Sequence, residues 1–221
     1  MGNRPLHFFW LLDCSSSMLE SGKIATLNFA VREAVPAMRR VADENPTTAL
    51  MVRTLTFSTG ARWHGRAAVP VSDFNWNDVT ASGVTDLGAG LRLLARELQT
   101  PPMPARALPP VLVLASDGHP TDDWRDGLKE VDDSPWGKHA VRVAIAVGHD
   151  ADRVMLTEFL GNPELQPLEA HNAAALIAAI RWTSTVAVKV ASAPRSGAEA
   201  GDRVSPLAPP TLDSSDRDDA W

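Results

Sequence analysis

The chain has 221 residues, of which 44% are hydrophobic and 22% charged, a composition typical of a globular protein with a sizeable core. Its single cysteine excludes an internal disulfide and a cysteine-based zinc cluster, and favours a reducing compartment. The formal net charge of −6 argues against a nucleic-acid partner, because nucleic acids are bound by clustered basic surfaces.

The first residues do not have the pattern of a targeting signal. The apolar run 6–12 contains His7, and Asp13 precedes Cys14 where a lipoprotein signal needs a small residue. Leu6 stands where a myristoylation motif needs Ser or Thr. No stretch approaches the roughly 20 apolar residues of a membrane span. We therefore expect a cytoplasmic, unprocessed protein that does not associate with membranes.

The first part of the chain predicts a strand, a helix and a hairpin. Residues 6–12 form a continuous apolar run, which is typical of a strand covered on both faces. Residues 23–42 carry apolar side chains at helical spacing, and Pro36 is expected to bend this helix or end its regular part early. Residues 49–57 predict a second strand, and the short turn after it makes the next strand, 61–69, antiparallel.

Helices and strands then alternate to about residue 183. This order implies an α/β fold: a doubly wound, mostly parallel six-stranded sheet with one antiparallel edge strand and helices on both faces, of the Rossmann-like type. In chain order the expected elements are a helix over 87–98, a strand over 111–116, a helix from about Asp122, a strand over 141–147, a helix over 151–160, a short strand over 165–168 and a helix over 172–183.

The composition changes at about residue 191. Residues 191–221 contain four prolines, six acidic and three basic residues, and few large apolar side chains, so their net charge is −3. Such a segment buries too little apolar surface to offset the entropy lost on ordering. We therefore expect one domain, 1–190, followed by a disordered acidic tail, 191–221.

Hydroxyl and carboxyl side chains gather where predicted strands end. Asp13, Ser15 and Ser17 directly follow the first strand, and alternate positions of an extended segment point to the same side. Thr85 lies at the start of a predicted helix, and Asp117 follows a buried strand. In a doubly wound sheet the ligand crevice lies at the carboxyl ends of the strands where the winding reverses, so the topology alone brings Asp13 and Asp117 together.

Hard oxygen ligands of this kind suit Mg²⁺, with Mn²⁺ or Ca²⁺ as alternatives. If hydroxyls bind the ion directly and carboxylates act through water, the ion stays under-neutralised and attracts a further anionic ligand. The sequence therefore predicts a metal site suited to binding a carboxylate as a further ligand of the ion. Its expected members are Asp13, Ser15, Ser17, Thr85 and Asp117.

Three segments carry a resemblance to a known family. Asp-x-Ser-x-Ser at 13–17, Thr85 within 82–88 and Asp117 within 115–122, in this order, resemble the metal-ion-dependent adhesion site (MIDAS) of von Willebrand factor A (vWA) domains. The resemblance covers residues 5 to about 185. Within that superfamily the segments are most similar to bacterial TerY-type proteins, which are encoded with tellurium-resistance systems. The resemblance implies hydroxyl ligands at Ser15, Ser17 and Thr85, and carboxylates behind water at Asp13 and Asp117.

The resemblance also implies a function. It implies a non-catalytic interaction module, often encoded beside a protein kinase and a PPM-type phosphatase, whose protein partner supplies an Asp or Glu to the metal. Cys14 departs from the small neighbours usual in other members, but it is not a ligand position. Asp86 adds a carboxylate beside Thr85, which could tighten metal binding or weaken the attraction for an acidic partner.

Simpler structural roles compete for several of these residues. Thr85 could cap the helix that follows it, and Asp122 is expected to cap the helix that begins near it. A histidine beside a metal site, such as His119, is more often a hydrogen-bonding neighbour than a catalyst. Cys14 is expected to be a small buried thiol rather than a reactive one.

A Mg²⁺-dependent phosphatase or phosphotransferase of the haloacid-dehalogenase type is the alternative, because it also places an Asp after the first strand as nucleophile. That chemistry needs a second Asp two residues later, where this chain has Ser15. None of the four lysines follows a later strand where it would balance phosphate charge.

The predicted tail adds a subordinate hypothesis. A partner kinase could modify hydroxyl groups in an exposed, disordered segment. The candidates are Ser196, Ser205, Thr211, Ser214 and Ser215.

Overall fold

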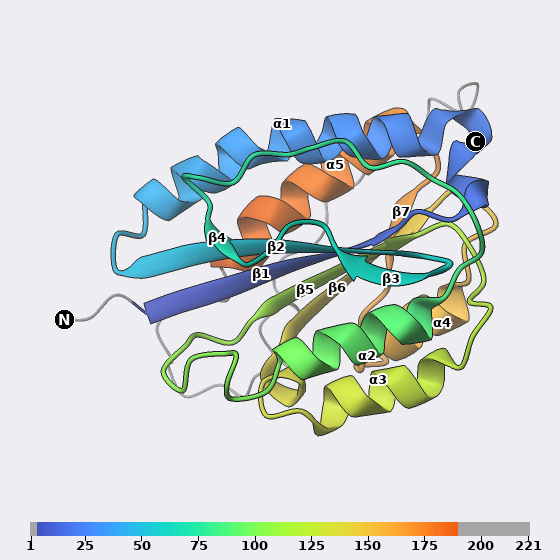
Figure 1. Cartoon of the computed structure of the whole chain (residues 1–221). Helices are drawn as coiled ribbons and strands as arrows, with labels where there is room; N and C mark the ends of the chain where they lie inside the picture. Colours follow the sequence, from blue (N-terminus) through green and yellow to red (C-terminus); the bar gives the residue numbers. More distant parts are fainter. Residues whose placement is uncertain (1–3, 190–221) are drawn as a thin grey trace.

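A seven-stranded sheet runs through the middle of the molecule (Figure 1). The computed structural model describes residues 4–189, so the tail predicted over 191–221 lies outside the described residues. The strand order is β3-β2-β1-β5-β6-β7, and β4 also pairs with β2. The strands are β1 (Arg4–Asp13), β2 (Thr48–Ser58), β3 (Gly60–Trp63), β4 (Val69–Pro70), β5 (Val111–Ser116), β6 (Val141–Val147) and β7 (Leu168–Ala170).

Helices cover both faces of this sheet (Figure 1). One hydrophobic core lies between the sheet and α1 and α5, and a second lies between the sheet and α2, α3 and α4. The helices are α1 (Lys23–Asp43), α2 (Leu87–Glu97), α3 (Trp124–Asp133), α4 (Arg153–Leu160) and α5 (Ala173–Trp182), with short helical turns η1 (Ser16–Gly22), η2 (Gly137–His139) and η3 (Thr183–Ala187).

The central strand β1 explains where the site lies. It pairs in parallel with β2 on one side and β5 on the other, and its side chains from Leu6 to Asp13 are buried. Phe8 and Trp10 contribute to the core under α1, whereas Phe9 and Leu11 contribute to the other core. The continuous apolar run therefore forms a strand covered on both faces, as predicted, and its carboxyl end lies beside that of β5.

The structure confirms the mostly parallel α/β architecture and changes three details. The expected antiparallel strand 61–69 is divided into β3 and β4, because the chain turns away from β2 around Gly65, whose φ is 119°. The sheet therefore has seven strands, two of them antiparallel, where six with one antiparallel strand were expected. Helix α1 continues through Pro36 to Asp43, with buried apolar side chains before and after the proline. The last strand lies at 168–170 instead of 165–168.

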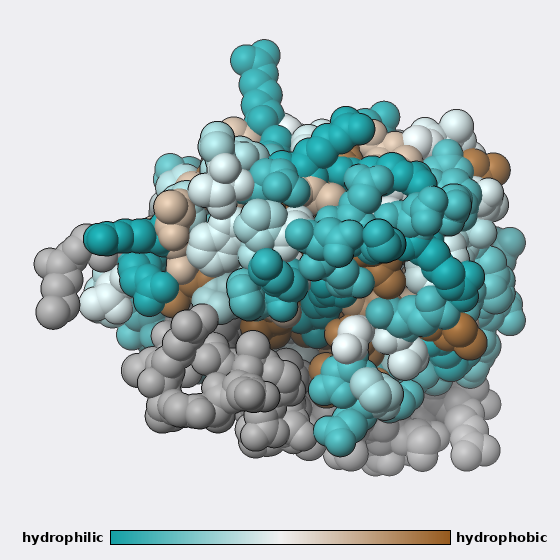
Figure 2. All heavy atoms as spheres, turned by 90° about the horizontal axis from the view of Figure 1, so that it is seen from below, coloured by the Kyte–Doolittle hydropathy of each residue, from teal (hydrophilic) through white to brown (hydrophobic). Residues whose placement is uncertain are grey.

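The surface seen from below, over α2 and α3, is largely hydrophilic (Figure 2). Hydrophobic residues appear there in small separate groups. Among residues 4–189, no helix is both long and apolar enough to cross a membrane.

Candidate metal centre

Asp13 ends β1 and is completely buried. Its Oδ1 accepts a hydrogen bond from the Ser15 backbone N–H at 2.8 Å, and its Oδ2 accepts one from the Ser116 hydroxyl at 2.6 Å. Burial raises the pKa of Asp13 to about 6, against these hydrogen bonds, and the nearby charge of Asp117 adds to the rise. The carboxylate is therefore fixed in orientation, and its charge favours the approach of a cation.

The two serine hydroxyls meet beside the second carboxylate. Ser15 Oγ and Ser17 Oγ lie 3.0 Å apart, and Ser17 Oγ donates to Asp117 Oδ1 at 2.7 Å. Ser15 is extended, with φ −70° and ψ 167°, but Ser17 lies in the 3-10 turn η1. The predicted convergence is thus confirmed, although a helical turn after Ser15, and not simple strand alternation, brings Ser17 round.

Gly118 shows where these oxygens point. A Cβ placed on Gly118 would lie 3.2 Å from Thr85 Oγ1, 3.6 Å from Ser17 Oγ and 3.8 Å from Asp13 Oδ2. Three of the predicted site oxygens, from the segments 13–17 and 82–88, therefore surround one small space beside Gly118, which belongs to the third segment and has no side chain. We call this space the Gly118 cradle.

Thr85 brings a free hydroxyl to the cradle. The residue is buried, and its hydroxyl forms no hydrogen bond with the rest of residues 4–189. Its backbone is held in place, because Thr85 N–H donates to Thr121 Oγ1 at 3.2 Å and Thr121 N–H donates to the Thr85 carbonyl at 2.9 Å. A hydroxyl oxygen has two lone pairs to offer, and the Thr85 hydroxyl lies at the cradle, so this oxygen is suited to a hard cation.

Backbone hydrogen bonds join the loop before Thr85 to the loop after β1. Ser82 N–H donates to the Cys14 carbonyl at 2.8 Å, and Ser16 N–H donates to the Gly83 carbonyl at 3.0 Å. The three sequence segments of the predicted site are therefore held against one another by main-chain contacts. These main-chain hydrogen bonds fix the positions of the site residues and leave their side-chain oxygens available for other contacts.

The neighbouring acidic residues have structural roles. Asp86 accepts from Gly60 N–H at 2.7 Å and from the Thr121 hydroxyl at 2.9 Å, so its carboxylate is used in holding the loops together. Asp122 does not cap α3, and that expectation was wrong. Its two oxygens accept from Gly88 N–H and Ala89 N–H, both at 2.8 Å, at the start of α2.

The helix ends explain why the Asp122 expectation failed. The capping residue of α3 is Asp123, through a 3.5 Å contact with the Asp126 N–H. Helix α2 receives no side-chain cap hydrogen bond from the residue before it, Asp86, so it takes its cap from a distant segment. Thr85 does not cap α2 either. A cap supplied by tertiary contact leaves no local pattern in the sequence.

Lys23, the first residue of α1, is a site residue that the sequence analysis missed. Its Nζ lies 2.8 Å from Asp117 Oδ2, and both side chains are almost fully buried. A lysine that balances charge at such a site is expected after a later strand, whereas Lys23 reaches the site from the start of α1. The only available signal was that Lys23 lies six residues after Ser17 in the same segment, at the start of a helix.

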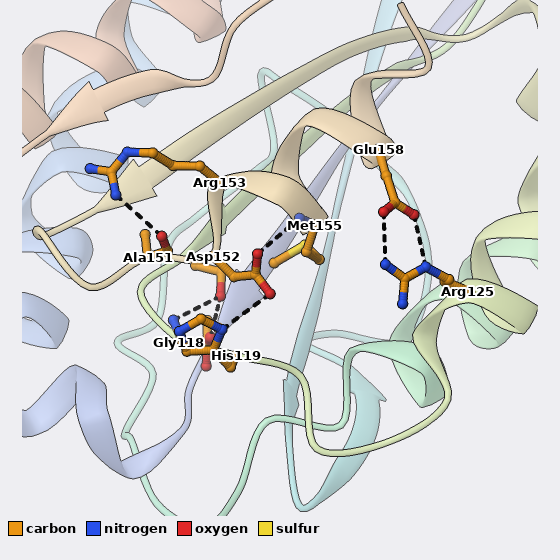
Figure 3. Close-up of polar contacts among 10 residues, drawn as sticks. Gly118, His119, Arg125, Ala151, Asp152, Arg153, Met155 and Glu158 are labelled. Atoms are coloured by element: carbon orange, nitrogen blue, oxygen red, sulfur yellow. Dashed lines mark hydrogen bonds and ion pairs between the residues drawn. The ribbon is translucent and has the colours of Figure 1, made fainter. Parts of the chain in front are cut away.

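His119 and Cys14 lie outside the group of site oxygens. His119 Nδ1 contacts Asp152 Oδ2 at 3.1 Å, and the side chain is 74% exposed (Figure 3). Asp152 also accepts from Met155 N–H and so caps α4. Burial raises the pKa of Cys14 to about 12, as expected for an inert buried thiol.

The donor set fits Mg²⁺ by its chemistry. Mg²⁺ binds hard oxygen ligands and usually keeps several waters, and the cradle offers hydroxyl and carboxylate oxygens around one space. No group of three or more His, Cys, Asp or Glu side chains in the described part of the chain has a metal-binding arrangement. A site here therefore depends on its hydroxyls, which distinguishes it from a carboxylate cage or a zinc site.

No protein-family model and no curated protein sequence matches the chain. Many solved structures share its fold at low sequence identity. A von Willebrand factor type A protein from Catenulispora acidiphila has a TM-score of 0.59 and 15% identity, covering 82% of this chain and 42% of that one. The pilus adhesin SpaC from Lactobacillus rhamnosus GG has a TM-score of 0.64 and 15% identity, covering 85% and 31%.

A third similar structure is the ArnB paralog VWA2 from Sulfolobus acidocaldarius, with a TM-score of 0.57 and 15% identity, covering 81% of this chain and 45% of that one. The chain thus spans less than half the length of each of these three proteins. It has the fold of a vWA domain.

Proposed function

We propose that the protein is a non-catalytic, Mg²⁺-dependent protein interaction module in which an Asp or Glu of the partner completes the coordination of the metal. One observation carries the proposal. The oxygens of Thr85, Ser17 and Asp13 surround the Gly118 cradle at the carboxyl end of the central strands. This edge is where doubly wound sheets bind their ligands.

Each member of the site has a distinct role in this proposal. The hydroxyls of Ser15, Ser17 and Thr85 hold the ion, and Asp13 and Asp117 act through water. The bound ion supplies a Lewis acid for a carboxylate oxygen. Because neutral hydroxyls contribute no charge, the ion keeps an attraction for an anionic ligand that a cage of carboxylates would cancel.

For the biological setting, we propose a cytoplasmic bacterial system of the TerY type, concerned with stress or tellurium resistance. The support is the similarity of the segments 9–18, 85–88 and 117–124 to TerY-type proteins. A protein kinase and a PPM-type phosphatase are the proposed partners. Phosphorylation of the tail would connect the module to the kinase, and those residues lie outside the described part of the chain.

The geometry disfavours a phosphotransferase of the haloacid-dehalogenase type. A nucleophilic Asp13 would need an exposed oxygen, yet the residue is completely buried and both oxygens accept hydrogen bonds. Ser15 stands where the general acid is needed, and its hydroxyl is engaged with Ser17. Lys23 does provide a cation at the site, but it is paired with Asp117. A phosphate-release assay with model substrates that gave Mg²⁺-dependent turnover would favour this alternative.

Copurification tests the proposal directly. Tagged wild-type protein is isolated from cells in Mg²⁺ and again in chelator, beside an Asp13→Asn variant whose folding is checked by circular dichroism. We expect a partner that is retained only by the wild type in Mg²⁺. A Ser16→Ala variant is the matched control, because Ser16 lies in the same loop with an exposed side chain and is not a proposed ligand. A partner retained equally under every condition would refute the proposal.

A further inference from the structure

A buried lysine reaches the proposed metal site. Lys23 Nζ lies 2.8 Å from Asp117 Oδ2, and the exposed fractions of the two side chains are 9% and 0%. Lysine is rarely buried unless it is paired, because removing an ammonium group from water is costly. The pairing with Asp117 therefore offsets a desolvation cost that an exposed position would avoid.

The surroundings are shaped for this ammonium group. A Cβ placed on Gly148, at the end of β6, would lie 3.3 Å from Lys23 Cε and 3.4 Å from Nζ. Gly148 also has a φ of 82°, which disfavours residues with a side chain. The lysine thus passes close to the main chain just after β6, where a side chain in place of Gly148 would require it to shift by a few tenths of an ångström.

Lys23 and Ser17 share the carboxylate of Asp117 between them. Ser17 Oγ donates to Oδ1 and Lys23 Nζ donates to Oδ2. Asp117 is therefore neutralised by a cation that belongs to the chain itself. Within residues 4–189 Lys23 forms its ion pair with Asp117 and none with Asp13, whose oxygens accept hydrogen bonds from Ser15 and Ser116.

We propose that Lys23 is a specificity-determining residue of this site: it weakens the binding of the metal alone and strengthens the binding of a carboxylate to the metal-loaded site. The inference rests on the proposed function. Its reason is the local charge. Asp13 and Asp117 contribute two negative charges and Lys23 one positive charge, so a divalent ion leaves a net charge of +1. One carboxylate from a partner then brings the site to neutrality.

Without Lys23, the same count of charges favours binding of the metal ion alone over binding of the metal ion together with a carboxylate. Two carboxylates and a divalent ion are already neutral, so the ion binds more firmly and an incoming carboxylate would leave a negative site. Metal and acidic ligand therefore bind cooperatively in the wild type. The module would take up its metal firmly only together with the acidic group of its partner.

The test compares Lys23→Met, which keeps the length and apolar stem of the side chain, with Lys23→Arg, which keeps the charge. Lys129→Met is the matched control, because Lys129 pairs with Asp133 on an exposed face of α3. Calorimetry measures Mn²⁺ binding to each purified protein. Water-proton relaxation of the Mn²⁺-loaded proteins then measures acetate binding. Circular dichroism in chelator and in Mn²⁺ checks that each variant folds.

We expect Lys23→Met to bind Mn²⁺ at least about tenfold more tightly than the wild type, and to bind acetate at least about tenfold more weakly once loaded. Lys23→Arg and Lys129→Met should stay near the wild type in both measurements. A Lys23→Met variant that folds only in Mn²⁺ would also support the proposal, because it shows the ion replacing the missing cation.

Two other results are distinguishable. Equal Mn²⁺ and acetate affinities in wild type and Lys23→Met would overturn the role of Lys23 and leave the proposed metal site standing. No Mn²⁺ binding by any of the proteins would overturn the metal-dependent function itself, and the role of Lys23 with it.

Discussion

Gly118 is the position at which a single methyl group should separate metal binding from folding. In a Gly118→Ala variant the added carbon lies 3.2 Å from Thr85 Oγ1, 3.6 Å from Ser17 Oγ and 3.8 Å from Asp13 Oδ2. None of these contacts is with the main chain, and the φ of Gly118 is not in the left-handed region. The backbone can therefore accept alanine, and only the Thr85 hydroxyl must shift by a few tenths of an ångström.

The expected magnitudes follow from these distances. Gly→Ala at an unstrained position changes the free energy of unfolding by at most about 1 kcal/mol, and it often stabilises. For the metal the effect is much larger. An ion bonded to the hydroxyls of Thr85 and Ser17 at about 2.1 Å would be in contact with the methyl group. Changes behind the ligands commonly cost 10–100-fold in metal affinity, and we expect a loss of more than about 100-fold here.

The assay combines Mn²⁺ calorimetry with chemical denaturation in chelator, and Ser16→Ala serves as the control from the same loop. The prediction is an unfolding free energy close to that of the wild type and no measurable Mn²⁺ binding. If Gly118→Ala bound Mn²⁺ with the wild-type affinity, the cradle could not be the metal site, and the reasoning from its geometry would fail.

Three further predictions concern the support of the site. Asp122→Ala should lower the free energy of unfolding by about 1–2 kcal/mol because it removes both caps of α2, whereas Asp123→Ala, with its 3.5 Å contact, should cost less; denaturant titration compares them. Since burial raises the pKa of Asp13 from 3.8 to about 6, Asp13 should contribute a loss of about 3 kcal/mol of stability in chelator as pH rises through this interval, and stability should be regained in Mg²⁺. Thermal melts of the wild type and Asp13→Asn from pH 3.5 to pH 7 measure this, and identical pH profiles of the two proteins in chelator would contradict it. Ser116→Ala, which removes the 2.6 Å hydrogen bond to Asp13, should raise the pKa of that carboxyl further and weaken Mn²⁺ binding, with Ser72→Ala as the exposed control.

Local sequence patterns were sufficient to predict the fold and to predict that Asp13 and Asp117 lie close together. The apolar runs of β1 and β5 identify buried parallel strands, and parallel neighbours bring Asp13 and Asp117 to one edge. Thr85 is held beside these two residues by hydrogen bonds to loops that are distant in sequence. In the sequence, only the order of the three segments indicated this position of Thr85. The predicted strand 61–69 was too long, because the turn around Gly65 outweighs the β propensity of this segment.

Two parts of the site lay beyond sequence reasoning for a physical reason. Lys23 and Asp122 act across 94 and 34 positions of the chain respectively, on groups that share no periodic pattern with them. A lysine at the start of a helix normally extends into solvent, and an aspartate before a helix normally caps that helix. In both cases a tertiary contact replaced the local preference.

The most direct test of the central claim is the anomalous diffraction of a crystal of this protein soaked in Mn²⁺, with and without acetate. The account predicts one strong peak in the Gly118 cradle, bonded to the hydroxyls of Ser15, Ser17 and Thr85, and an acetate oxygen on the same ion when acetate is present. A map with no peak in the cradle, in a crystal whose cradle is open to solvent, would contradict it.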